Sequence, residues 1–326
     1  MLLDKAKNRG RAFCIILGWL WAAALSAQPP LHQDELARAQ QWLAEGRYAQ
    51  AFEVFQSYAQ EKQHPLAQFT LALFYQLGWG RDVDEIQACQ WHGKAAEKGV
   101  PAANHFFAEC LHHGIHQPAD YPAAMHWYQQ AANLGHAISL CAIVELVMQG
   151  KSPETNRQEA LQACEAVAAA GSIPAQLQLG RLYLMDESSL RDPQKAATWY
   201  GYAAEKGSPQ AGYHLGMIHQ DIFGDSARAL YWFETAASQG YIPAYYPTAN
   251  LYFMAPVSDK TGMPRADNLA KAYLWLLATE RQSAQAHELQ AVGQMLGALR
   301  QIMPASWEAV LDQRVAQHLQ THHPIK

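Results

Sequence analysis

The chain has 326 residues, half of them apolar and 16% charged, so it has enough apolar side chains for a continuous core. Its 24 Lys and Arg against 29 Asp and Glu give a net charge of −5. This acidic balance argues against nucleic acid or an anionic membrane as the main partner.

Residues 1–27 have the pattern of a secretory signal peptide. Four basic residues lie in the first eleven positions, and an apolar run from Ala12 to Leu25 ends in Ser26 and Ala27. This pattern predicts a cut near Ala27 and a periplasmic or secreted protein, with an uncleaved anchor as the alternative. The run is shorter than the roughly 20 residues of a spanning helix, so we expect no stable membrane insertion after cleavage. Cleavage would remove four basic residues and Asp4, which changes the net charge to −8.

An internal repeat of about 36 residues follows a predicted helix over residues 36–46. The phrase Ala-Ala-x-x-Gly ends at Gly99, Gly135, Gly207 and Gly240, and a degenerate copy ends at Gly171. These glycines are 36, 36, 36 and 33 residues apart. The period is too long for one helix or strand and therefore indicates a stacked supersecondary unit.

Each unit is predicted to be a pair of helices. Tryptophan recurs eight residues before the glycine, at Trp91, Trp127, Trp199 and Trp232. Alanines lie three residues before and four residues after each tryptophan, a spacing typical of one helix face, so we expect the tryptophans in the core. The glycine ends this first helix in the left-handed conformation, and a nearby proline opens the second helix.

Residues 282–326 differ from the repeats. Apolar residues recur at steps of three and four over residues 284–300 and again over residues 306–319, which predicts two further helices. We expect this pair to cover the apolar end of the last repeat, as a stacked fold requires, and to end in a short frayed tail.

The recurring positions resemble the Sel1-like repeat, a relative of the tetratricopeptide repeat. That pattern includes Leu-Gly-x-x-Tyr-x-x-Gly and Ala-x-x-Trp-x-x-x-Ala-Ala-x-x-Gly, and residues 41–279 carry it in register. The resemblance implies an all-α fold, a right-handed αα-hairpin solenoid of about six to seven repeats over residues 28–281, with helical caps. The unit over residues 136–171 departs most, because it lacks the tryptophan and has Val147 in place of tyrosine.

The resemblance also implies a binding groove lined by the second helices. If the tetratricopeptide register transfers, the groove residues are Phe69, Leu73, Gln76, His105, Glu109, His112, Met148, Arg181, Met185, Tyr213 and Met217. Trp79 lies outside the repeating register, in the turn Gly78-Trp79-Gly80. It is either an exposed contact for a partner or a side chain packed against the neighbouring turn.

Four cysteines lie outside the leader, and their spacing is compatible with two disulfides. Cys89 and Cys110 are nearly equidistant from the turn at Gly99, and Cys141 and Cys164 from a turn near residue 153. Residues equidistant from the turn of an antiparallel helix pair lie level, so each pair could bridge two helices in an exported protein. The alternative is four buried thiols that pack as small apolar side chains.

The sequence contains no motif of a catalytic or cofactor site, such as Gly-x-Ser-x-Gly, a phosphate-binding glycine loop or His-Glu-x-x-His. A polar cluster comprises His105, Glu109, His112, His113 and His116, and the first three share a helix face. Histidines seven residues apart are about 10 Å apart along the axis, too far to bind one zinc ion on a straight helix. We therefore expect no metal or cofactor and interpret the cluster as a polar groove wall.

These patterns predict a non-enzymatic scaffold that binds a protein or peptide partner in the cell envelope. The resemblance implies a role in envelope assembly, regulation or host contact. One alternative is a cell-wall-directed enzyme or ligand-binding protein, like repeat proteins linked to penicillin binding or β-lactam hydrolysis, but this chain lacks their cysteine-rich repeats. A metal-binding envelope protein is the other alternative.

Overall fold

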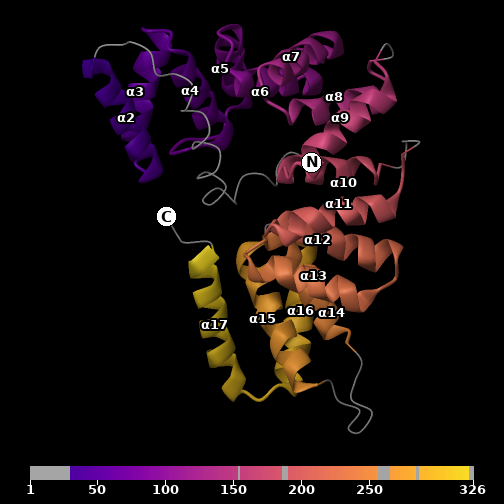
Figure 1. The fold of residues 1–326 in the computed structure, drawn as a ribbon. Helices are drawn as coiled ribbons and strands as arrows, with labels where there is room; N and C mark the ends of the chain where they lie inside the picture. Colours follow the sequence, from indigo (N-terminus) through magenta and orange to yellow (C-terminus); the bar gives the residue numbers. More distant parts are fainter. Residues whose placement is uncertain (1–29, 153–154, 186–189, 256–264, 284–285, 323–326) are drawn as a thin grey trace. The chain divides into compact units, whose positions relative to one another are not determined.

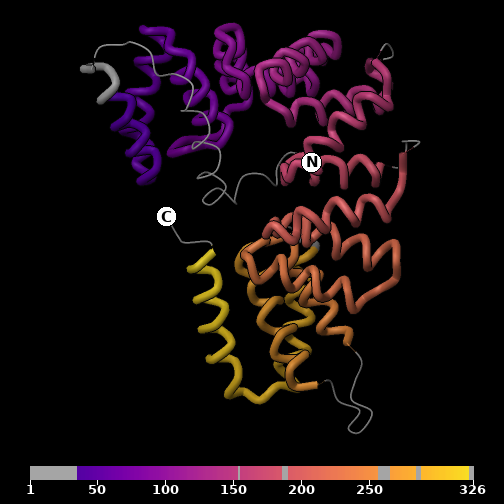
Figure 2. Tube along the Cα trace, in the orientation of Figure 1, coloured from indigo at the N-terminus to yellow at the C-terminus, as the bar shows by residue number. Residues whose placement is uncertain are grey.

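The computed structural model describes residues 30–152, 155–185, 190–255, 265–283 and 286–322. The predicted signal peptide and the last four residues lie outside these ranges. Within them every regular element is a helix, as Figures 1 and 2 show, which confirms the all-α prediction. The chain divides into two units, Met1–Val167 and Ala168–Lys326. We call them unit 1 and unit 2 and describe each by itself.

Unit 1 is a series of helices in which each of the first seven described packs against its neighbour along the chain. Its helices are α2 (Pro30–Ala44), α3 (Tyr48–Gln60), α4 (Pro65–Leu77), α5 (Glu85–Glu97), α6 (Pro101–His113), α7 (Tyr121–Asn133), α8 (Ser139–Met148) and most of α9 (Arg157–Ala169). The second helix of one pair packs closely on the first helix of the next, as α4 does on α5 and α6 on α7. This is the packing order expected of stacked αα-hairpins.

Unit 2 continues with the same pairing and ends in three longer helices. It contains α10 (Ile173–Leu182), α11 (Pro193–Glu205), α12 (Pro209–Met217), the π-helix η2 (Ile218–Ile222), α13 (Ser226–Ser238), the 3₁₀ turn η3 (Ile242–Ala244), α14 (Tyr245–Phe253), α15 (Ala266–Gln282), α16 (Ala286–Ile302) and α17 (Ser306–His322). Both α16 and α17 pack on α15, where the sequence predicted a covering pair.

The repeated glycines end helices as predicted. Gly99, Gly135, Gly171, Gly207 and Gly240 all have positive φ angles between 76° and 100°. Only glycine adopts this region of φ at little cost, so the phrase that defines the repeat marks the end of each first helix.

Side-chain caps at the start of five first helices, α5, α7, α9, α11 and α13, recur with the same period and were missed in the sequence. Asp84, Asp120, Asp192 and Asp225 each accept a hydrogen bond from a backbone N–H two or three residues later, and Asn156 does the same for α9. Each such cap stabilises its helix by roughly 1 kcal/mol. The signal was present, since an aspartate or asparagine recurs about every 36 residues.

The core face of the first helices is centred one residue beyond the predicted position. Trp91 is buried, but Trp127, Trp199 and Trp232 are only half-buried. The residue after each tryptophan is buried instead, namely His92, Tyr128, Tyr200 and Phe233. Each of those positions lies four residues after one repeated alanine and three residues before the next, so it occupies the middle of the apolar stripe of its helix.

Two disulfides join helices within unit 1. Cys89 on α5 bonds Cys110 on α6, and Cys141 on α8 bonds Cys164 on α9, with Cα–Cα distances of 5.8 and 4.7 Å. These are the pairs that lie level across their turns in the sequence.

Candidate functional site

The predicted groove residues fall in both units. Arg181, Met185, Tyr213 and Met217 lie in unit 2, on or directly after α10 and α12. The other seven lie in unit 1, on the second helices α4, α6 and α8, and we call them the second-helix row: Phe69, Leu73, Gln76, His105, Glu109, His112 and Met148. The second-helix row is the larger of the two sets.

Only part of the second-helix row is accessible to a partner. Phe69, His105 and His112 are buried and form part of the packing between helices. Leu73, Gln76 and Met148 are half-buried. The Glu109 side chain, which is 34% exposed, offers the accessible charge of the row.

His105 connects three elements of unit 1 through one serine. Its Nδ1 lies 3.0 Å from the Ser139 hydroxyl at the start of α8, and the Nδ1 of His136 lies 3.0 Å from the same oxygen. The Nε2 of His105 lies 3.6 Å from the Glu109 carboxylate. A hydroxyl carries one proton, so Ser139 donates to one imidazole and accepts from the other.

Ser139, His105 and Glu109 thus stand in the order of a serine-based catalytic triad. The serine, however, has no exposed surface. Its oxygen is also shared between two imidazoles, that of His105 on α6 and that of His136 in the turn before α8. A substrate cannot reach a hydroxyl in that position, so the arrangement holds helices together rather than presenting a nucleophile.

Two glutamine–histidine pairs repeat this pattern along the row. Gln76 Oε1 lies 3.0 Å from His92 Nε2, and Gln149 Oε1 lies 3.2 Å from His112 Nε2. The His92 ring also stacks on Phe106 with a centroid distance of 5.0 Å. His92, His105 and His112 therefore link helices of unit 1 through their ring nitrogens and ring faces.

Burial sets the protonation of these histidines. Together with the smaller effect of electrostatic repulsion from His105, it lowers the pKa of His92 to about 3 and that of His136 to about 4. Burial also raises the pKa of Tyr128, and the carboxylates of Glu109 and Glu145 raise it further. At neutral pH the rings of His92 and His136 are uncharged, whereas Glu109 and Glu145 place negative charge near Tyr128.

The metal-binding alternative finds no support here. Among the residues that the structure describes, no three His, Cys, Asp or Glu side chains are arranged to hold a metal ion. His105 and His112 face Ser139 and Gln149 instead of one common point.

The prediction that Trp79 is an exposed partner contact is wrong. Trp79 is 6% exposed, lies parallel to the Tyr48 ring at 6.2 Å and meets Phe74 edge-on at 5.4 Å. The turn folds back on the preceding helix pair, which is the alternative that the sequence left open.

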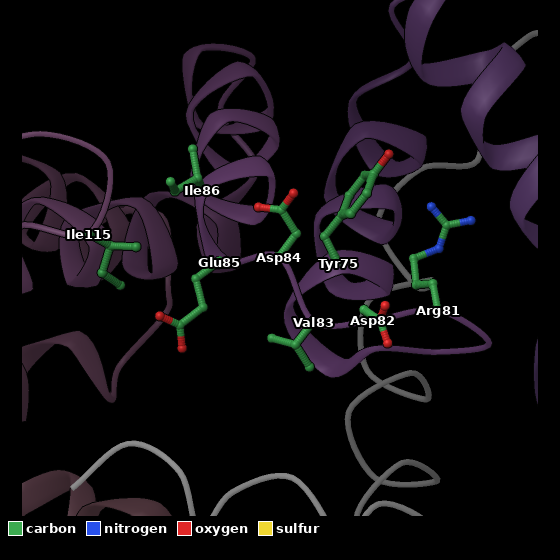
Figure 3. Close-up of a pocket in the computed structure, with 8 residues that line it drawn as sticks. All are labelled: Tyr75, Arg81, Asp82, Val83, Asp84, Glu85, Ile86 and Ile115. Carbon is green, nitrogen blue, oxygen red and sulfur yellow. The ribbon is translucent and has the colours of Figure 1, made fainter.

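A shallow hollow between the start of α5 and the turn after α6 was not predicted from the sequence. Figure 3 shows its apolar rim, in which Val83 and Ile86 are 47% and 52% exposed. Arg81 stacks on the Phe52 ring, and Asp84 caps α5. These polar groups have structural roles, so the hollow is a secondary candidate beside the second-helix row.

Comparison with known families identifies the repeat. Four segments match the Sel1 repeat: residues 65–100, 101–136, 173–208 and 210–241. The chain contains four Sel1 repeats. Sel1 repeats generally build scaffolds for protein–protein interaction. Residues 137–172 have no match, which agrees with the predicted departure of this unit, although α8 and α9 form there.

Similar proteins support the repeat assignment. An uncharacterized protein of Neisseria meningitidis is 34% identical over 164 residues, which is 50% of this chain and 32% of that protein. The chitin synthase regulator SKT5 of Saccharomyces cerevisiae is 28% identical over 63% of this chain and 32% of its own length. The chain therefore spans about a third of the length of these relatives.

Solved structures show the same fold. A Sel1 repeat protein from Oxalobacter formigenes superimposes with a TM-score of 0.53 at 22% identity, covering 76% of this chain and all of that chain. Yeast Tom70 gives a TM-score of 0.52 at 12% identity, covering 91% of this chain and 66% of that chain. None of the described helices is long and apolar enough to cross a bilayer.

Proposed function

We propose that this chain is a non-enzymatic scaffold that binds a protein or peptide partner through the second-helix row of unit 1. The observation that carries the proposal is the division of roles within the repeat. Glycines, alanines and a buried ring in four of the first helices recur for packing, whereas the row position held by Leu73 and Glu109 has arginine in a later repeat, at Arg181. Variable positions on a regular scaffold are where recognition is encoded.

The charge of the row favours a basic partner segment. Residues 99–150 contain no Lys or Arg, and Glu109 and Glu145 both lie close enough to Tyr128 to raise its pKa. A partner with Lys or Arg side chains complements this surface, and its binding would weaken as the salt concentration rises.

Two features support an exported protein acting in the cell envelope. The first 27 residues have the signal-peptide pattern, and unit 1 contains two disulfides, which persist in oxidising compartments. Fractionation of cells and N-terminal sequencing of the mature protein test this, with Gln28 expected as the first residue. A mature protein that keeps Met1 and stays in the cytoplasm would contradict export.

The binding surface is tested by crosslinking the full-length protein in its own host and identifying the partner. Glu109→Lys reverses the accessible charge of the row, and Glu53→Lys makes the same change at an exposed position of α3 outside it. We expect a partner captured by the wild type and by E53K but reduced at least tenfold with E109K. Equal capture by all three proteins would place the contact elsewhere.

A further inference from the structure

The last helix, α17, lies along α15 and is joined to α16 by a short turn over residues 303–305 (Figure 1). Its main packing partner is α15, although α16 precedes it in the chain. Three side chains form its buried stripe, Leu311, Val315 and Leu319, at a spacing of four residues. This is the pattern of an amphipathic helix lying in a groove.

An aromatic floor receives this helix. We define the α17 groove by Tyr245 of α14 and by Tyr273 and Trp275 of α15, all buried. His318 of α17 bonds the Tyr245 hydroxyl through Nε2 at 3.0 Å and meets the Trp275 ring edge-on at 5.3 Å. The groove thus accepts an apolar stripe and one ring nitrogen.

The helix that carries most of the floor, α15, packs more extensively on α14 than on α17. In α15, eight of 17 residues are buried, and the helix packs extensively on α14. In α17, only three of 17 residues are buried. His318 and the half-buried Trp307 add ring contacts with the core, whereas the ion pairs of α17 lie at the surface, such as Asp312 with Arg281 at 3.4 Å and Glu308 with Arg300 at 3.8 Å. Surface ion pairs of this kind add little to stability.

We propose that α17 is a ligand held in cis, and that the α17 groove is a binding site for an amphipathic helix of a partner protein. The partner helix carries apolar side chains at positions i, i+4 and i+8 and a hydrogen-bonding ring or amide at i+7, as α17 does with Leu311, Val315, Leu319 and His318. This site lies in unit 2 and is independent of the second-helix row.

The proposal predicts competition between α17 and a helix added in trans. A tethered helix competes at an effective concentration on the order of millimolar, so the intact protein binds an added copy weakly. The probe is a synthetic, fluorescently labelled peptide of residues 304–322. Val315→Asp disables the cis helix, and Val310→Asp makes the same substitution at a position of α17 that is 52% exposed.

We expect the full-length V315D protein to bind the peptide at least tenfold more tightly than V310D or the wild type, as measured by fluorescence anisotropy. Binding by folded V315D that is no tighter than that of V310D would overturn the proposal. Loss of the thermal transition of unit 2 in V315D would also overturn it, because α17 would then be an integral part of the fold.

Hydrogen exchange of the wild-type protein gives a second test that needs no variant. The amides of α17 should exchange through an opening that leaves α14 and α15 protected. Equal protection of all three helices, lost only on global unfolding, would show that α17 does not leave its groove.

Discussion

Replacing His92 by phenylalanine should remove a share of the acid sensitivity of unit 1. His92 is 1% exposed, and its Nδ1 has no hydrogen-bond partner among the described residues. Tyr128, Tyr200 and Phe233 occupy the same position in other repeats, so an aromatic ring fits this slot. H92F loses the bond to Gln76, worth about 1 kcal/mol, but gains apolar burial. The free energy of unfolding at pH 7 should therefore change by less than about 1 kcal/mol.

The effect of pH follows from the protonation of His92 in the two states. Its pKa is about 3 when folded and about 6.5 when unfolded, so the unfolded chain binds more protons between these values. The free energy of unfolding therefore falls as the pH drops from 6.5 toward 3. At pH 5 the loss from this residue is about 2 kcal/mol, from about 1.4 kcal/mol per pH unit over about 1.5 units.

Urea unfolding of wild type and H92F at pH 7 and pH 5, followed by circular dichroism, measures this difference. We expect the loss of stability on acidification to be about 2 kcal/mol smaller in H92F. His126→Phe makes the same substitution at an exposed position of α7 and should leave the wild-type loss unchanged. If H92F loses as much stability as the wild type, His92 is not kept neutral by burial and the reasoning fails.

Three further comparisons test local contacts of the fold. Gly180→Ala places a Cβ 2.7 Å from a tyrosine ring and should cost about 1–3 kcal/mol, whereas Gly201→Ala, with nothing within 4 Å, should gain about 0.5 kcal/mol or more in thermal unfolding. Asp120→Ala removes the cap of α7 and should cost about 1 kcal/mol, while Asn or Ser at this position should restore most of it. Replacing Cys141 and Cys164 together by alanine should cost about 3 kcal/mol in urea unfolding and speed hydrogen exchange in α8 and α9; unchanged exchange would argue against the bond.

Much of the fold was predictable because the repeat encodes it locally. A glycine in the left-handed region, such as Gly99 or Gly207, ends a helix whatever surrounds it, so the spacing of the repeated glycines predicted the helix pairs directly. The aspartate caps at Asp84 and Asp120 act just as locally and could have been found from the same period. The shift of the buried face from Trp127 to Tyr128 is a matter of about 100° around a helix, which spacing alone does not resolve.

The site was less predictable because its contacts join distant residues. His105 and Ser139 are 34 residues apart, and their bond depends on two side-chain conformations and on the packing of α6 on the start of α8. The sequence placed His105 on a groove wall, whereas the structure buries it as a link between helices. Trp79 illustrates the same limit, since its burial depends on Tyr48 from the preceding helix pair.

The repeat register also explains what holds the helices together in the least typical unit, residues 136–171. Ring pairs recur between the second helix of one pair and the first helix of the next: Phe69–His92, His105–Tyr128 and Tyr213–Phe233, with centroid distances of 5.6, 5.4 and 5.8 Å. Moving the first pair forward by 72 residues gives Cys141 and Cys164, which are joined by a disulfide. A ring contact contributes about 0.5–1.5 kcal/mol beyond its burial, and burial of one aromatic side chain about 1.5–3 kcal/mol. A disulfide closing a loop of this length contributes about 3 kcal/mol. The covalent bond is therefore of the right size to replace the missing ring pair, in the one internal segment that does not match the Sel1 repeat.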